Sequence, residues 1–241
     1  KSRIAGNNID FIATSTLLLS HLDVFPLSLN TNTTASLDIN LHKSDSGLFF
    51  RKGIFKIENF SFGLSGMISD NDKLNLKITG RNIDISKIKK FLPEKYINKF
   101  MEYDPAGILR IDCGLNGIMD RKNNPDIKIS FVLENGHVFY QKSNIALNKL
   151  SLSGSFSNGN LKSPEASNLI INSARATLGS ADYSGSLTVK NFKSPEINLL
   201  FSGELIPSEL TEFFNMKEGS WSEGSVILNL KLSGILPLKE K

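Results

Sequence analysis

Histidine and cysteine, which could bind a metal or act in catalysis, are few in this 241-residue chain, and they lie far apart in the sequence. The three histidines are His21, His42 and His137, and none has a second ligand at the spacing of a metal-binding motif. The single cysteine, Cys113, stands in a run of alternating apolar residues, which favours a small buried hydrophobe over a reactive thiol. We therefore expect no metal site, no thiol nucleophile and no cofactor.

Acid–base catalysis would need two carboxylates that converge on one bond, as in the glycosidases. The acidic residues of interest fall at outward-facing strand positions or near turns, and they are Glu58, Asp84, Asp112, Glu134 and Asp182. No local motif brings two of them together. The sequence also lacks a nucleophile elbow, a phosphate-binding loop and a dinucleotide fingerprint. These observations predict a protein that is not an enzyme.

Strands with alternating apolar and polar residues dominate the chain, so that apolar side chains gather on one face of a sheet. Turn-forming clusters at 69–72, 123–125 and 157–160 separate these strands. Within 55–64 the alternation changes phase between Ile57 and Phe60, which predicts a β-bulge. The predicted fold is mainly β with a few short helices: an elongated, curved antiparallel sheet, or repeating β-groove, with an apolar concave face.

The apolar positions of these strands are the candidate binding residues. Such a face either packs as an ordinary core between two sheet layers or forms an open groove that holds an apolar ligand. The candidate lining residues are Leu37, Ile39, Leu41, Phe60, Phe62, Leu74, Leu76, Ile78, Leu109, Ile111, Leu115, Ile127, Ile129, Phe131, Leu187, Val189, Ile197, Leu199, Phe201, Val226, Leu228 and Leu230.

Two segments have helical spacing instead of alternation. The first begins with Ser86 as its N-cap, and Pro93 starts a second turn that extends to Met101. The second begins at Ser208 and extends to Phe214. Lysines 87, 89, 90, 95 and 99 make the first segment basic, which would suit acidic lipid head groups. The second segment carries Glu209 and Glu212 where the first has Lys87 and Lys90, however, so a solvated surface is the interpretation we favour.

The two helical segments belong to an internal repeat. Residues 74–80 align with 197–203, 86–92 with 208–214, and 107–117 with 224–234, with the apolar positions in phase. Repeat units of this kind bury their apolar faces against neighbouring units. We therefore expect one elongated β-rich region over 1–241, with approximate units at 45–120 and 165–241, cut from a longer chain.

Charge and hydropathy exclude two other classes of protein. Lysine plus arginine number 28 and aspartate plus glutamate number 24, so the net charge of +4 is too small to indicate nucleic-acid binding. The most apolar stretch, 11–29, is interrupted by Ser20, His21, Asp23 and Pro26. It therefore falls short of the roughly 20 apolar residues that a membrane-spanning helix needs.

The repeat has a recognisable pattern: a strand that ends in Gly80, a helix that begins with Ser86-Lys87-Ile88, then Phe91-Leu92-Pro93, Gly107-Ile108-Leu109 and Gly117. This pattern resembles the AsmA-like proteins of Gram-negative envelopes, and most of all the forms found in Bacteroidetes. The second copy, from Pro195 through Gly203 and Ser208 to Gly234, is similar to the same pattern.

The resemblance implies a lipid-handling function. Members of the family, with their TamB-like and YhdP-like relatives, are anchored in the inner membrane and extend into the periplasm as curved sheets with an apolar inner surface. The implied partners are phospholipid acyl chains, the inner membrane through an anchor preceding Lys1, and an outer-membrane or periplasmic protein. The implied function is the shielding of acyl chains during inner-to-outer membrane transport, which supports outer-membrane integrity.

Two alternatives stay open at this point. A closed β-sandwich or β-solenoid would make the chain a structural or interaction module that binds no lipid. A transmembrane β-barrel also has alternating strands, but the two helical segments interrupt its hairpin series. Access of a hydrophobic probe to the apolar face discriminates between the groove and the closed module.

Overall fold

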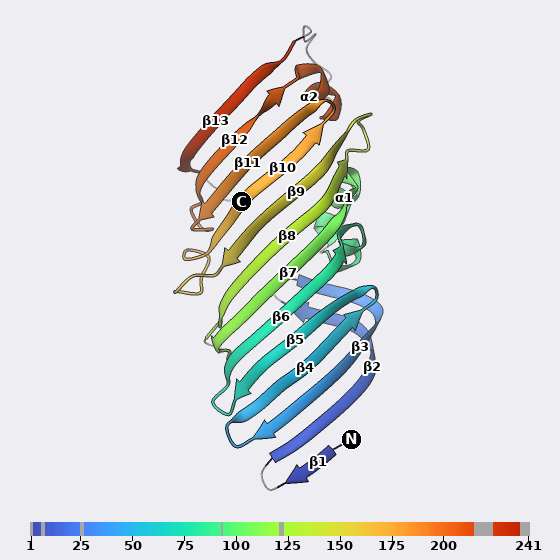
Figure 1. Ribbon diagram of the computed structural model, residues 1–241, viewed down its shortest axis with the longest axis vertical. Coiled ribbons are helices and arrows are strands. Elements are labelled where there is room, and N and C mark those ends of the chain that lie inside the picture. The colour runs from blue at the N-terminus through green and yellow to red at the C-terminus, as the bar shows by residue number, and fades with distance from the viewer. Residues whose placement is uncertain are drawn as a thin grey trace.

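The computed structural model describes residues 2–5, 8–24, 27–92, 94–120, 123–214 and 224–236. Within these residues, thirteen strands form one antiparallel sheet, and each strand pairs with its neighbours in the sequence (Figure 1). Helices interrupt this series at two places. The predicted fold class, mainly β with a few short helices in one elongated antiparallel sheet, is confirmed.

The strands are long and the connections between them are mostly short. In chain order the elements are β1 (Ser2–Ala5), β2 (Asn8–Val24), β3 (Leu27–Ser44), β4 (Gly47–Ile57), β5 (Phe60–Ser69), β6 (Lys73–Asp84), η1 (Ile85–Phe91), α1 (Glu94–Tyr103), β7 (Pro105–Ile118), β8 (Asp126–Phe139), β9 (Ala146–Ser157), β10 (Asn168–Leu178), β11 (Ala181–Lys190), β12 (Glu196–Leu205), α2 (Pro207–Phe213) and β13 (Val226–Ile235).

The phase change between Ile57 and Phe60 is a hairpin turn, so the β-bulge predicted there is wrong. Glu58 has a positive φ of 50° in the two-residue turn that joins β4 to β5. Ile57 and Phe60 pair directly across this turn and therefore point to the same face. A register shift does occur in this hairpin, but it lies between Phe50 and Gly53.

The repeated segments have the same strand pairing in both copies. In the hairpins β4–β5 and β10–β11, the register shifts between Phe50 and Gly53 in the first and between Ile171 and Ala174 in the second. After the hairpin, each copy continues with a strand, a helical segment and a second strand (Figure 1).

The strands on either side of the helices also match. Leu76 pairs with Leu115 between β6 and β7, and the aligned residues Leu199 and Leu232 pair between β12 and β13. The internal alignment found in the sequence therefore corresponds to the same strand pairing for 74–80 and 197–203, although only β6–β7 has a register shift, between Gly80 and Ile83.

The first helical segment is capped by Asp84, so the prediction of Ser86 as N-cap is wrong. The Asp84 carboxylate accepts hydrogen bonds from the backbone N–H and the hydroxyl of Ser86, at 3.1 and 2.7 Å. These bonds, the hydroxyl above all, lower the pKa of Asp84. Lys87 forms an ion pair with the same carboxylate at 3.3 Å. Pro93 lies outside the described residues, as do the side chains of lysines 90 and 95.

The main core lies between β3 and the first copy, next to the ends of β2 and β3. These ends, residues 18–24 and 27–34, extend beyond β4 and are called the arm. Figure 1 shows the arm behind the sheet, and β3 contacts η1 there. The buried cluster consists of Ala35, Ile57, Phe60 and Ile83, with Phe55, Phe62, Ile88, Leu109 and Ile111 packed against it.

A glycine in β5 has a backbone conformation that other residues adopt only with strain. Gly66 has a φ of 119°, and a Cβ added there would lie 2.0 Å from the Asn75 carbonyl oxygen. We expect Gly66→Ala to lower the free energy of unfolding by about 1–3 kcal/mol. Urea unfolding followed by far-UV circular dichroism measures this change.

Gly114 in β7 is the matched control. It has no positive φ, and a Cβ added there would meet only the Lys128 carbonyl oxygen, at 3.9 Å. We expect Gly114→Ala to raise stability by about 0.4–1 kcal/mol because the unfolded chain loses freedom. Equal effects of the two substitutions would contradict this account.

Candidate functional site

His42 and His137, the two histidines whose side chains the structure describes, contact different partners. His42 Nδ1 lies 2.8 Å from an Asp10 carboxylate oxygen, and His137 Nδ1 lies 2.8 Å from the Asn148 side-chain oxygen. The side chain of His21 is outside the described residues. Among the residues that the structure describes, no three histidine, cysteine, aspartate or glutamate side chains come together as a possible metal site.

The candidate carboxylates lie in different strands and turns of the sheet, and most of them form an ion pair or a hydrogen bond there. Asp112 and Glu134 each form an ion pair with an arginine of the neighbouring strand. Asp182 accepts a hydrogen bond from a threonine of the same hairpin at 2.6 Å. Asp84 caps η1, and Glu58 lies in the β4–β5 turn. This arrangement stabilises strand pairs and turns, and it does not place two acids on either side of one substrate bond.

The predicted apolar lining residues lie on one face of the sheet, because directly paired residues point to the same side. Two rows of paired residues cross the sheet from β3 to β13. The first row is Leu37, Phe55, Phe62, Gly80, Ile111, Phe131, Gly154, Ile171, Leu187, Leu199 and Leu232.

The second row lies two residues further along each strand. It is Ile39, Gly53, Leu64, Ile78, Cys113, Ile129, Phe156, Leu169, Val189, Ile197 and Gly234. Neither row contains a polar side chain other than the weakly polar thiol. The sheet therefore has a hydrocarbon surface that continues across strand after strand.

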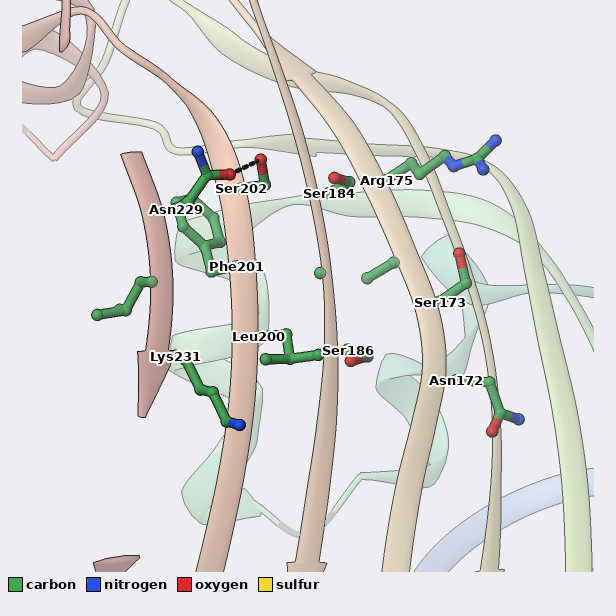
Figure 2. A pocket seen from close by; sticks show the side chains of 13 residues that line it. Asn172, Ser173, Arg175, Ser184, Ser186, Leu200, Phe201, Ser202, Asn229 and Lys231 are labelled. Carbon is green, nitrogen blue, oxygen red and sulfur yellow. Dashed lines mark hydrogen bonds between the residues drawn. The ribbon is translucent and has the colours of Figure 1, made fainter. Parts of the chain in front are cut away.

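The opposite face of the same strands carries most of their polar side chains, although Leu200, Ile227 and Ile235 also lie on it. A shallow depression of about 470 Å³ lies over β10–β13 on this face. Figure 2 shows its lining side chains, among them Ser184, Ser186, Ser202 and Asn229. The Ser202 hydroxyl and the Asn229 side-chain oxygen lie 2.7 Å apart, with the hydroxyl as donor. The chain thus separates its two faces by chemistry, as strict alternation requires.

The apolar face is only partly covered. Phe60 and Leu74 are buried, at 4% and 7% exposure, whereas Val226 is 56% exposed and the other predicted lining residues are half-buried or exposed. No large side chain in the described part of the chain is fully buried. Two sheets packed face to face would bury most of these residues. The described strands instead belong to one sheet, so the sandwich architecture of the closed-module alternative is absent from them.

A hollow of about 360 Å³ lies on the apolar face over β9 to β12. It is called the β9–β12 hollow, and its apolar lining consists of Leu147, Leu150, Leu152, Ile171, Ala174, Ala176, Tyr183, Gly185, Leu187, Leu199 and Phe201. Only Leu187, Leu199 and Phe201 are among the residues predicted from the alternation. The signal for the others was weak, because β9 and β10 interleave their apolar residues with serine, glycine and alanine.

Aromatic rings lie over glycines at three places on this face. A Cβ added to the glycine would come within 3.2 Å of the ring in each pair, and the pairs are Phe62 with Gly80, Phe131 with Gly154, and Tyr183 with Gly203. The aromatic ring occupies the space that a side chain at the glycine position would fill. The ring therefore lies close to the backbone of the neighbouring strand.

Cys113 lies on the apolar face between Ile78 and Ile129 in the second row. Its side chain is half-buried, and burial raises the pKa of the thiol. A raised pKa keeps the thiol protonated and unreactive at neutral pH. Cys113 therefore contributes to the apolar surface.

No family model, no curated protein and no solved structure matches this chain. In the described part of the chain, none of the helices has the length and apolar character needed to span a membrane.

Proposed function

We propose that this chain is a non-enzymatic, lipid-handling segment of an AsmA-like envelope protein. Its apolar face shields phospholipid acyl chains during transport between the inner and outer membranes, which supports outer-membrane integrity. The observation that carries the proposal is the pair of apolar rows, which continue across the sheet from β3 to β13 and are only partly covered.

The energetics of acyl chains require such a continuous surface. Exposing one methylene group to water costs about 0.8 kcal/mol, so a chain of about 15 carbons costs on the order of 12 kcal/mol. A polar side chain within the apolar rows would therefore block the movement of an acyl chain along them. Both rows satisfy this requirement along their whole length.

The dimensions of the sheet also suit this ligand. A 14-residue strand such as β8 is about 46 Å long at roughly 3.3 Å per residue. One leaflet of hydrocarbon is about 15 Å deep, half of a bilayer core of about 30 Å. The apolar face is thus wide enough for an acyl chain to lie across it with its head group in water. Hydrophobic contact is non-directional, which allows the lipid to move along the rows.

The proposal includes a location and partners. The chain would act in the periplasm, with an anchor in the inner membrane that lies outside residues 1–241 and a protein partner in the periplasm or the outer membrane. The resemblance of the two repeat copies to AsmA-like proteins supports this part of the proposal.

A protein-binding module is the second candidate, and β13 favours it. Ile227 and Ile235 are apolar residues on the polar face of this strand, and their side chains are 78% and 64% exposed. An exposed strand with apolar residues on both faces is a surface on which another strand can pair.

Native mass spectrometry with organic extraction tests the proposal. We expect the chain, purified from a bacterial host without detergent, to retain phospholipid at a defined stoichiometry, because the apolar rows are otherwise exposed to water. A lipid-free mass for a folded protein would contradict the proposal and favour the protein-binding module.

A further inference from the structure

The two repeat copies differ in side-chain size at several equivalent positions of their hairpins, and two of these positions lie next to each other. In the first copy, Phe55 pairs with Phe62, and Gly53 pairs with Leu64. In the second copy, Ala176 pairs with Tyr183, and Ala174 pairs with Gly185. The positions correspond because the pair next to the turn, Ile57–Phe60 in the first hairpin and Leu178–Ala181 in the second, lies the same number of residues from the register shift in both. The first copy therefore has Phe55 and Leu64 where the second has alanine and glycine.

These small residues form the floor of the β9–β12 hollow. Ala174 and Gly185 stand side by side on β10 and β11, and the next residues in the same paired row are Leu152 on β9 and Phe201 on β12. The large side chains on either side become the walls. A volume of about 360 Å³ is at the lower end of the roughly 300–1,000 Å³ of small-molecule sites.

In the first copy the equivalent space is filled and covered. Phe55 packs against the buried cluster of Ile57, Phe60 and Ile83, and Ile88 of η1 packs against the same cluster. Next to the arm, Ala35 of β3 pairs with Ile57 and is 1% exposed. The second copy has no such arm: β9 begins at Ala146, and its first pairs with β10 are Leu147 with Leu178 and Asn148 with Thr177. The hollow is therefore left open in the second copy.

The lining selects an uncharged occupant without polar groups. The Arg175 and Ser184 side chains alternate to the polar face, where Figure 2 shows them. Burial, with Glu209 nearby, raises the pKa of Tyr183, so its hydroxyl stays neutral. An extended peptide in the hollow would place its backbone N–H and C=O groups against carbon atoms, which form no hydrogen bonds with them. Binding of a peptide there is therefore unfavourable.

The width of the hollow excludes a helix as well. Leu152 and Phe201 stand on strands three spacings apart, roughly 14 Å at about 4.8 Å per strand, and their side chains narrow this gap further. An α-helix with its side chains is about 10–12 Å across. A single hydrocarbon chain is no wider than one extended side chain and fits between the walls.

We propose that the β9–β12 hollow is a binding site for one acyl chain of a phospholipid, floored by Ala174, Ala176 and Gly185. The proposal rests on the lipid-handling function and adds a preferred site to it. The acyl chain takes the place that Phe55 and Leu64 occupy in the first copy. The apolar face then has one site at which a lipid pauses, in its C-terminal half, and a filled counterpart in its N-terminal half.

Photo-crosslinking with Ala176→Phe tests this site. The probe is phosphatidylcholine with a diazirine in one palmitoyl chain, presented in vesicles, and the crosslinked residues are mapped by peptide mass spectrometry. In the unmodified chain we expect crosslinks to concentrate on the lining residues of the hollow. The substitution introduces the residue type that the first copy has at this position, and we expect it to reduce these crosslinks about fivefold or more by filling the hollow.

Ser184→Phe adds an aromatic ring at a neighbouring position on the polar face and is the matched control, with crosslinks expected to stay within about twofold of the unmodified chain. Ala176→Leu is the second variant if the phenylalanine variant loses its circular dichroism signal. Crosslinks spread evenly along both rows, and unchanged by either substitution at Ala176, would overturn the site and leave the lipid-handling function standing. Absence of crosslinks anywhere would overturn both.

Discussion

Leu199→Asp is expected to reduce the phospholipid that co-purifies with this chain by about tenfold or more, which corresponds to about 1.4 kcal/mol of binding free energy per tenfold. Leu199 is half-buried in the first apolar row, between Leu187 and Leu232. A carboxylate at this position would have to give up its water when an acyl chain covers it, and an unpaired buried charge is strongly unfavourable. The amount of lipid is measured by native mass spectrometry and organic extraction.

The neighbouring residue is a matched control because it lies on the other face. Leu200 is 52% exposed and pairs with Ser186 and Lys231 on the polar face. We expect Leu200→Asp to leave the bound lipid unchanged, and both variants to keep the circular dichroism signal of the sheet. Loss of all β-structure in Leu199→Asp alone would show that its row is a closed core. Equal loss of lipid in the two variants would contradict the assignment of the apolar face as the lipid surface.

The strands with strict alternation could be predicted from the sequence. Residues 109–115 and 127–133 lie in β7 and β8, and 197–201 and 226–232 lie in β12 and β13. Alternation succeeds there because one face is apolar and the other meets water. The β9 and β10 strands were not predicted, because pairing on both sides holds them in the sheet even though serine, asparagine and alanine weaken their pattern.

The face of each candidate residue could be predicted, but not how far that face is covered. Period-two spacing places Leu76 and Ile78 on one side of β6 whatever lies above them. Coverage depends on the arm and η1, which come from segments distant in the sequence. The β9–β12 hollow depends in turn on Ala174 and Gly185 being next to each other across two strands, and this neighbourhood follows from register alone.

The repeat illustrates the same limit. Residues 74–80 and 197–203 align because both copies need the same alternation at this strand. The hairpins β4–β5 and β10–β11 share their register, yet Phe55 and Leu64 correspond to Ala176 and Gly185. Backbone pairing and turn position tolerate this change in side-chain volume, because the sheet face there is not packed against a second layer. The equivalence of the two hairpins is therefore evident from their strand pairing and not from their residue types.

Phe60→Ala is expected to lower the stability of the first copy by about 3–5 kcal/mol, the usual cost of removing a buried phenylalanine. Phe60 is 4% exposed and packs in the cluster that joins β3, the β4–β5 hairpin, β6 and η1. Phe214→Ala is the control, since Phe214 is 53% exposed beyond the end of α2. We expect that variant to lose no more than about 0.5 kcal/mol.

The effect of Phe60→Ala should stay local, because repeat units contact only their neighbours and, among the described residues, the buried cluster of the first copy includes none from the second. Amide hydrogen exchange measured by mass spectrometry is therefore expected to accelerate by about two to four orders of magnitude in β3 to β6 and η1. Exchange in β10 to β12 should keep its original rate. Equal acceleration in both regions would mean that the sheet unfolds as one cooperative unit, and the two halves of the apolar face could then not differ in how easily they open to a lipid.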